Sequence, residues 1–241
     1  MDERIGTLYA VGVGPGDPEL LTVRAARVLG EVDRVFAAGH ERSGRSRALE
    51  AARPHIPPTT PVEVIGFSHT FQGLETRRVH RRLAPRIAAC LRQGRSAAFL
   101  TLGDPSTYST FSYFLEALRE VLPEAPVRVV PGVTSFAAAA AAAGVPLAEG
   151  DEGFAVVSAS RGLEPVRRAL DAVENVVILK PYRNTAAVCD LLETRGLAPR
   201  TLYASRCSLP GALTRWGVEP ARRHAEYLSL FLVKGTGGRE P

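Results

Sequence analysis

Short apolar runs alternate with longer amphipathic stretches along most of the chain, and glycine- or proline-containing turns separate them. Apolar runs bounded by turns have the length of buried strands, whereas apolar residues three and four positions apart predict helices. Strands are predicted at residues 7–13, 32–38, 62–65, 97–100, 127–130, 155–157, 176–179, 201–204 and 227–233. Helices are predicted at residues 22–30, 46–52, 77–93, 111–118, 136–143, 164–172 and 186–195.

The regular alternation of strands and helices is typical of an α/β fold, in which helices cover both faces of a mostly parallel sheet. Thr22 is a good N-cap for the first helix, and Gly30 is expected to end it. Pro123 and Pro126 indicate a linker, so we expect two α/β domains, residues 1–123 and 124–241. The strand at 127–130 would then open the second domain.

The most informative stretch is TLGDPSTYSTF at residues 101–111, directly after the predicted strand 97–100. It places a carboxylate, several hydroxyls and a tyrosine on the turn after a strand, and the carboxyl edge of an open α/β sheet is where small ligands bind. Such neutral groups with one acid suit a ligand with hydroxyls, an amine and an aromatic face better than a bare phosphate. Alternatively, Gly103-Asp104-Pro105 is a proline turn with an Asx cap that needs no ligand.

A glycine-rich loop, GVGPGDP at residues 12–18, follows the first predicted strand. A dinucleotide fingerprint G-x-G-x-x-G would need a third glycine where Asp17 stands, and Pro18 removes an amide donor from the loop. No P-loop motif G-x-x-x-x-G-K-[ST] occurs elsewhere. The residues leave two interpretations open: a structural turn, or a wall of a ligand cleft.

Composition is that of a globular protein, with 45% apolar and 23% charged residues and a formal charge of +5 over 241 residues. Nearly all of the cations are arginines, which suit recognition of carboxylates or phosphates, although arginine also serves solubility. No block of basic residues interleaves with aromatic ones, so nucleic acid is not favoured as a partner. No apolar run reaches the roughly 20 residues of a membrane span, and no signal peptide is visible, so a cytoplasmic protein is expected.

Sites for metal or covalent chemistry are not indicated. The cysteines lack metal or disulfide spacing and are expected to be buried or inert, and no nucleophile elbow occurs. His69 lies in a loop with Ser68 and could be an acid or base, or simply a solvated side chain. The remaining histidines are expected at the surface: His40, His55, His80 and His224.

Three motifs together resemble the tetrapyrrole methylases, the S-adenosylmethionine-dependent enzymes of corrin and sirohaem synthesis. They are VGVGPGDPELLT at residues 11–22, LGDPSTYSTF at 102–111 and VPGVTSF at 130–136. The form G-D-P-x-x-Y-S-T-F-x-Y, with YLSLFLVK near the end of the chain, resembles the branch that methylates carbon 20 of precorrin-2 or its cobalt-bearing counterpart.

This resemblance implies two α/β domains that meet at a ligand cleft, a homodimer, the methyl donor S-adenosylmethionine and a polycarboxylate tetrapyrrole substrate. It implies that Pro15 and Asp17 line a trough facing the tetrapyrrole. The residues implied to hold the donor are Gly103, Asp104, Pro105, Tyr108, Ser109, Thr134, Ser135, Lys180 and Arg206.

The chemistry of methyl transfer fits these residue types. A sulfonium methyl is already activated, so the enzyme mainly needs in-line positioning, which supplies about 7–11 kcal/mol at best. A carbon nucleophile must also lose a proton, for which Asp17 and His69 are candidate bases. Alternatives are a family branch with another acceptor, a non-catalytic module that binds donor or tetrapyrrole, and a nucleotide-dependent α/β enzyme.

Overall fold

The computed structural model describes residues 4–40, 43–67 and 74–235. It divides into two compact units, residues 1–134 and 135–241. Within the described ranges, no helix is both long and apolar enough to cross a bilayer.

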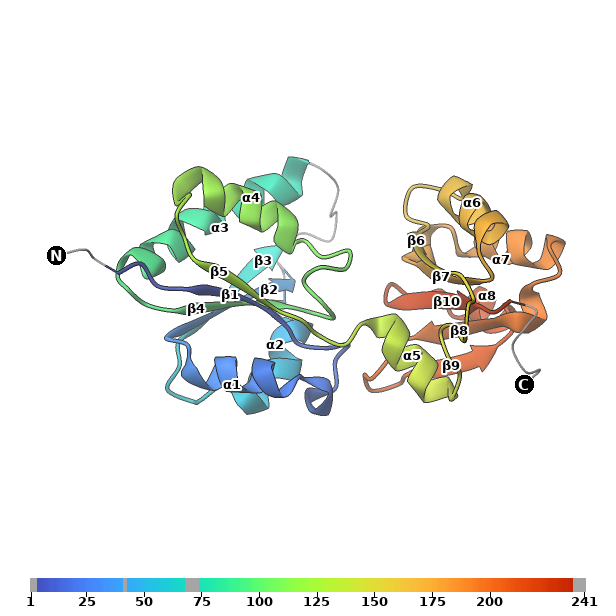
Figure 1. The fold of residues 1–241 in the computed structure, drawn as a ribbon, viewed down its shortest axis with the longest axis horizontal. Helices are drawn as coiled ribbons and strands as arrows, with labels where there is room; N and C mark the ends of the chain where they lie inside the picture. The colour runs from blue at the N-terminus through green and yellow to red at the C-terminus, as the bar shows by residue number, and fades with distance from the viewer. Residues whose placement is uncertain (1–3, 41–42, 68–73, 236–241) are drawn as a thin grey trace. The chain divides into compact units, whose positions relative to one another are not determined.

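The first unit is a five-stranded, all-parallel sheet with helices on both faces (Figure 1). Its strand order is β3-β2-β4-β1-β5. The strands are β1 (Leu8–Gly12), β2 (Arg34–His40), β3 (Val62–Phe67), β4 (Ala97–Thr101) and β5 (Val127–Val130). The helices are α1 (Val23–Glu31), α2 (Arg47–Ala52), α3 (Leu74–Arg92) and α4 (Phe111–Val121), with 3-10 turns η1 (Pro18–Leu20) and η2 (Arg53–His55).

Strand β4 lies at the centre of this sheet, between β2 and β1, and is buried along its whole length. Its side chains alternate between two cores. Phe99 packs in the core that includes α3 and α4, whereas Leu100 packs in the core that includes α1 and α2. Because all five strands are parallel, their carboxyl ends share one edge of the sheet, where the glycine-rich loop and the 101–111 turn must therefore meet.

The expected helix caps are confirmed in part. The Thr22 side chain accepts a hydrogen bond from the backbone N–H of Ala25 at 3.1 Å. Gly30, however, does not end α1: the helix continues to Glu31, and the backbone turns extended at Val32. The prediction was wrong because Gly30 does not adopt the left-handed conformation of a helix-ending glycine, whereas Gly94 after α3 does (φ +73°).

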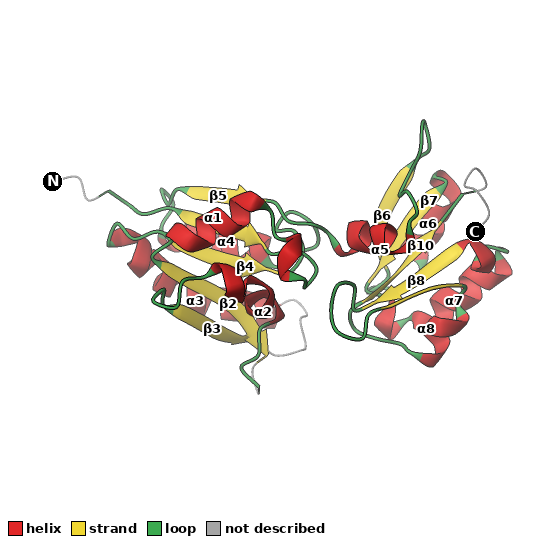
Figure 2. Cartoon of the chain, turned by 90° about the horizontal axis from the view of Figure 1, so that it is seen from below, coloured by secondary structure: helices red, strands yellow, loops and turns green. Residues whose placement is uncertain are grey.

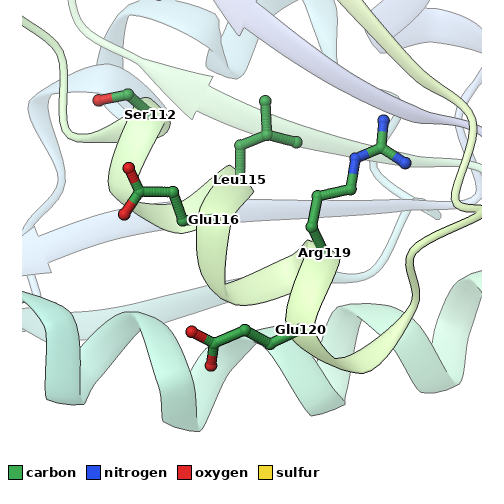
Figure 3. A pocket seen from close by; sticks show the side chains of 5 residues that line it. All are labelled: Ser112, Leu115, Glu116, Arg119 and Glu120. Carbon is green, nitrogen blue, oxygen red and sulfur yellow. The ribbon is translucent and has the colours of Figure 1, made fainter.

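The outer face of α4 carries a hollow, and Figure 3 shows the side chains that line it: Ser112, Leu115, Glu116, Arg119 and Glu120. Two of these charged groups have partners within the first unit. Arg119 donates to the carbonyls of Pro123 and Ala125, and Glu120 pairs with Arg81 of α3 at 3.2 Å. These contacts hold α4 against α3 and against the turn that follows α4. The charged side chains at the hollow therefore have a structural role.

Strand β5 closes the first sheet and does not open the second unit. It pairs in parallel with β1, with Leu8 opposite Val127 and Val11 opposite Val130. The linker signal at 123–126 therefore marks the turn between α4 and β5, and the division between the units follows Thr134. The prediction that residues 127–130 begin a new unit was wrong because proline-rich turns occur within domains as well as between them.

The second unit has a five-stranded sheet in the order β6-β7-β10-β8-β9, drawn in yellow in Figure 2. Its strands are β6 (Phe154–Ser158), β7 (Asn175–Leu179), β8 (Thr201–Ser205), β9 (Leu213–Trp216) and β10 (Ser229–Val233). Its helices are α5 (Ser135–Ala143), α6 (Glu164–Ala172), α7 (Thr185–Thr194) and α8 (Glu219–Arg223), with 3-10 turns η3 (Pro181–Arg183) and η4 (Ala198–Arg200).

This second sheet is mixed. Only β6 and β7 pair in parallel, whereas β10 runs antiparallel to both β7 and β8, and β9 runs antiparallel to β8. The α/β class is confirmed, but the expected mostly parallel arrangement holds for the first sheet alone. Strand β9 and helix α8 were not predicted, because elements of four and five residues give too little periodicity to detect.

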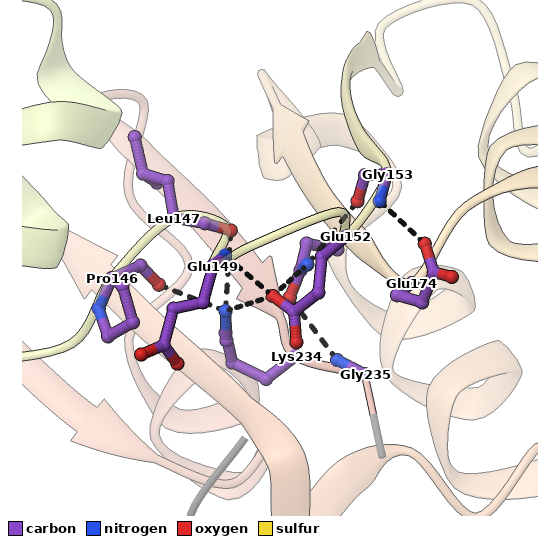
Figure 4. Close-up of polar contacts among 9 residues, drawn as sticks. Pro146, Leu147, Glu149, Glu152, Gly153, Glu174, Lys234 and Gly235 are labelled. Carbon is purple, nitrogen blue, oxygen red and sulfur yellow. Dashed lines mark hydrogen bonds and ion pairs between the residues drawn. The ribbon is translucent and has the colours of Figure 1, made fainter. Parts of the chain in front are cut away.

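A buried lysine ties the start of the second unit to its last strand (Figure 4). The Lys234 ammonium donates to the carbonyls of Pro146 and Leu147 at 3.0 and 3.3 Å and lies 3.8 Å from a carboxylate oxygen of Glu152. Glu152 also accepts a hydrogen bond from the Asn175 side chain at 2.9 Å. Each charge is thus compensated, which a buried charge requires.

His80 is fully buried, contrary to the surface position predicted from its arginine-rich neighbours. It lies on the same stripe of α3 as Leu83, Ala84 and Ile87, and its ring meets that of Phe114 edge-on at 6.0 Å. Helical spacing predicts the burial of a residue better than the charge of its sequence neighbours does, because residues three and four apart share one face of the helix. Burial disfavours the imidazolium and lowers the pKa of His80 to about 4.

We predict that His80 makes the protein sensitive to mild acid. The folded protein binds a proton here less readily than the unfolded chain, whose pKa is near 6.5, so stability is complete above pH 6.5 and falls toward pH 4. The loss is at most about 3 kcal/mol. Urea unfolding at several pH values should show this loss of unfolding free energy in the wild type and not in His80→Leu. Exposed His224→Gln is the control, and an identical pH dependence in His80→Leu would contradict the assignment.

Candidate functional site

The glycine-rich loop and the central turn are joined by their backbones at the carboxyl edge of the first sheet. Gly14 and Gly103 exchange two hydrogen bonds, of 3.2 and 2.7 Å, and the Val13 N–H donates to the Thr101 carbonyl at 3.0 Å. The two motifs, almost ninety residues apart in the chain, form one continuous surface. The loop at 12–18 is therefore attached to the turn and is not a separate element.

Two glycines, Gly12 and Gly132, let three backbone segments approach unusually closely. A Cβ atom added to Gly132 would lie 2.2 Å from the Gly103 carbonyl oxygen, and one added to Gly12 would lie 2.7 Å from the Gly132 nitrogen. No side chain fits at such distances. Glycine is thus required here by the contact of backbones from β1, the 101–111 turn and the turn after β5.

Asp104 holds this arrangement together. Its Oδ2 accepts a hydrogen bond from the Gly132 N–H at 2.9 Å, and its Oδ1 accepts from the Ser106 N–H at 2.8 Å and the Thr107 hydroxyl at 3.3 Å. The Asx turn considered from the sequence is present. The carboxylate also reaches beyond its own turn, so it fixes two strand-end turns relative to each other.

The rest of the turn combines a helix start with a strained residue. The Ser109 hydroxyl oxygen accepts a hydrogen bond from the Phe111 N–H at 3.0 Å, which stabilises the first turn of α4. Tyr108 adopts a left-handed backbone conformation (φ +50°), and its side chain is 48% exposed. Pro105, in the same turn, is buried. A bulky residue in this conformation is strained, and such strain is concentrated at functional sites.

The residues predicted to face the tetrapyrrole differ in exposure. Pro15 is buried, whereas Asp17 is half-buried. The Asp17 side chain accepts a hydrogen bond from the Glu19 N–H at 2.9 Å and caps η1, and the Pro18 carbonyl lies 3.1 Å from Nε2 of His55. His69, the other candidate base, lies outside the described residues.

Thr134, the last residue of the first unit, and the predicted residues of the second unit also lie at strand and helix ends. Thr134 and Ser135 are half-buried at the start of α5. Lys180 follows β7 and Arg206 follows β8, and because both strands run antiparallel to β10, these residues reach the same edge of the second sheet. Burial lowers the pKa of the Lys180 amine.

Several residues that the family resemblance assigns to the donor have a strained backbone. Among the described residues, the non-glycine residues with positive φ are Tyr108, Lys180, Arg206 and Ser208. The resemblance implies that three of these four, Tyr108, Lys180 and Arg206, hold the donor. Strain of this kind persists only where the surrounding structure holds it in place, and no sequence pattern indicated it.

Two of the three cysteines are buried, as the sequence led us to expect. Cys90 and Cys189 are buried, and burial raises the pKa of both thiols, that of Cys189 to about 11. Over the described part of the chain, no three histidine, cysteine, aspartate or glutamate residues gather as metal ligands would. The arrangement around the turn can bind and orient a ligand through backbone groups and hydroxyls.

The sequence matches a known protein family over most of its length. Residues 7–217 match the family described as Tetrapyrrole (Corrin/Porphyrin) Methylases. The chain is 37% identical over 206 residues to a cobalt-precorrin-2 C(20)-methyltransferase of Salmonella typhimurium, covering 86% of each chain. It is 32% identical over 241 residues to a precorrin-2 C(20)-methyltransferase of Sinorhizobium sp, covering 96% of each.

A solved structure shares the fold. The uroporphyrin-III C-methyltransferase of Thermus thermophilus, determined in complex with S-adenosylhomocysteine, is 28% identical to this chain. The superposition covers 95% of this chain and 92% of that one, with a TM-score of 0.68.

We predict opposite effects of alanine at two glycines. Gly132→Ala should lower the free energy of unfolding by about 2 kcal/mol, because the new methyl group overlaps the Gly103 carbonyl. Gly30→Ala is the matched control: it lies in α1 with open space around it and should raise that free energy by about 0.5–1 kcal/mol. Urea unfolding measures both, and a harmless Gly132→Ala would contradict the close packing described above.

Proposed function

The chain belongs to the tetrapyrrole (corrin/porphyrin) methylases, and we propose that it transfers a methyl group from S-adenosylmethionine to carbon 20 of precorrin-2 in cobalamin biosynthesis. One observation carries the proposal: relatives named for this reaction match at 37% and 32% identity over most of both chains. Function is thereby assigned through homology along the chain, and the fold alone would not assign it.

The residues around Asp104 fit the methyl donor. The donor brings an activated sulfonium methyl, and its adenosine and amino acid parts present hydroxyls, an amine and a carboxylate. Neutral hydroxyls, backbone groups and one acid can match these groups without a phosphate-binding loop. The residues proposed to hold it are Gly103, Asp104, Pro105, Tyr108, Ser109, Thr134, Ser135, Lys180 and Arg206.

The protein supplies mostly positioning. The Asp104 hydrogen bonds and the Gly14–Gly103 bridge hold the turn in one geometry before the ligand binds, which is how orientation lowers a barrier. We propose that Pro15 and Asp17 form the acceptor side of the site. Asp17 or His69 would take the proton lost from the methylated carbon, and Asp17 keeps acceptor capacity beyond its single capping bond.

Two finer features belong to the same proposal. The enzyme would act as a homodimer, which light scattering of the purified protein tests. The acceptor would be precorrin-2 or its cobalt-bearing counterpart, since the two relatives described above are named for one or the other. Turnover with metal-free and cobalt-loaded substrate distinguishes these acceptors.

We expect purified protein, S-adenosylmethionine and reduced precorrin-2 to give a product heavier by one methyl group. With a ¹³C-methyl donor, NMR of the product should place the label on carbon 20. A label on another carbon would indicate a different branch of the family. Donor and acceptor binding without any gain in mass would indicate a non-catalytic binding module, and would contradict the proposal.

We also expect Asp104→Ala to weaken binding of S-adenosylhomocysteine at least about tenfold in calorimetry, because the turn loses its tie to Gly132. Asp33→Ala is a matched control: Asp33 accepts two hydrogen bonds of 2.7 Å from Ser96, just before the other end of β4. It should lower stability without changing this affinity. Equal affinities in Asp104→Ala and the wild type would remove Asp104 from the donor site.

A further inference from the structure

Thr101 is the last residue of β4 and carries a hydroxyl that protein groups do not satisfy. The residue is 9% exposed, and across the described residues its Oγ1 is the one buried side-chain hydroxyl without a hydrogen-bond partner. Burying a hydroxyl in this way costs free energy that folding does not recover. Each such group in a native structure requires an explanation.

Other buried hydroxyls of the protein are satisfied internally. Thr201 donates to the Leu197 carbonyl at 2.8 Å, and Thr185 donates to the Pro181 carbonyl at 3.1 Å. Both of these threonines lie in the second unit, at the beginning of a strand or helix. Thr101 differs from them in lying at the carboxyl end of a central strand, where α/β sheets bind ligands.

The position of Thr101 separates it from the groups held by Asp104. Thr101 pairs with Gly12 on β1, and the residue before it pairs with Ala37 on β2, so Thr101 lies between these two strands. The Asp104 carboxylate instead reaches Gly132 after β5, on the other side of β1. The neighbour of Thr101 on β1, Gly12, has no side chain, and the backbones of Gly103 and Gly132 lie where one would be.

We propose that the Thr101 hydroxyl binds the tetrapyrrole acceptor, to which it donates a hydrogen bond at one carboxylate. This inference rests on the proposed function and adds a binding residue to it. A rotation of about 120° around χ1 moves the hydroxyl to the position that the methyl group now occupies, and it breaks no hydrogen bond because the hydroxyl makes none with the described protein groups. A carboxylate is the stronger acceptor for such a donor, since a charged partner shortens and strengthens the bond.

The test compares two isosteric substitutions. Thr101→Val removes the hydroxyl and keeps the shape, Thr101→Ser keeps the hydroxyl, and Thr201→Val is the matched control whose hydroxyl has an internal partner. Each full-length variant is measured for melting temperature, for binding of a stable octacarboxylate porphyrin and for binding of S-adenosylhomocysteine. Wild-type turnover of precorrin-2 is measured beside them.

We expect Thr101→Val to bind the porphyrin about tenfold more weakly with an unlowered melting temperature, and Thr101→Ser to bind within about threefold of the wild type. Thr201→Val should melt lower and bind both probes normally. Unchanged porphyrin binding by Thr101→Val, or a loss confined to S-adenosylhomocysteine, overturns the role of Thr101 even if the wild type methylates precorrin-2. Absence of wild-type turnover overturns the proposed function itself.

Discussion

The close contact of three backbones at the carboxyl edge of the first sheet constrains everything built around it. Gly12 and Gly132 lie so close to each other and to the Gly103 carbonyl that neither has room for a Cβ atom, and the Asp104 carboxylate accepts a hydrogen bond from the Gly132 N–H. Because the loop at 12–18 is bridged to the same turn through Gly14, its geometry depends on this contact as well. The strand-end turns are therefore held in one arrangement by backbone contacts.

Such rigidity suits methyl transfer. An activated methyl group needs alignment with the attacking carbon more than it needs a nucleophile or a strong acid, and alignment is what preorganised turns provide. The strain at Tyr108, Lys180 and Arg206 fits the same view, because left-handed backbone at non-glycine residues persists only where the surroundings enforce it. The carboxylate of Asp104 thus serves first as a structural tie.

The α/β class, most elements and the resemblance to the family follow from local pattern. Apolar runs such as residues 97–100 have the length of buried strands, and the polar residues of the turn after that run are adjacent in the sequence. His80 shows where local reasoning failed: arginines beside it suggested the surface, whereas its spacing from Leu83 and Ile87 placed it in the core. The prediction that β5 belongs to the second domain was wrong for a similar reason: a proline turn does not reveal whether the next strand joins the same sheet.

The sequence by itself determined which residues stand at strand ends, because apolar periodicity and turn residues are local properties of the chain. Tertiary structure decided which of those ends meet. Only the fold brings Gly132 against Gly103, turns the Asp104 carboxylate toward an N–H twenty-eight residues away, and leaves the Thr101 hydroxyl buried without a protein partner among the described residues. Hydrogen-bond satisfaction and backbone strain depend on groups distant in sequence, so no local pattern encodes them.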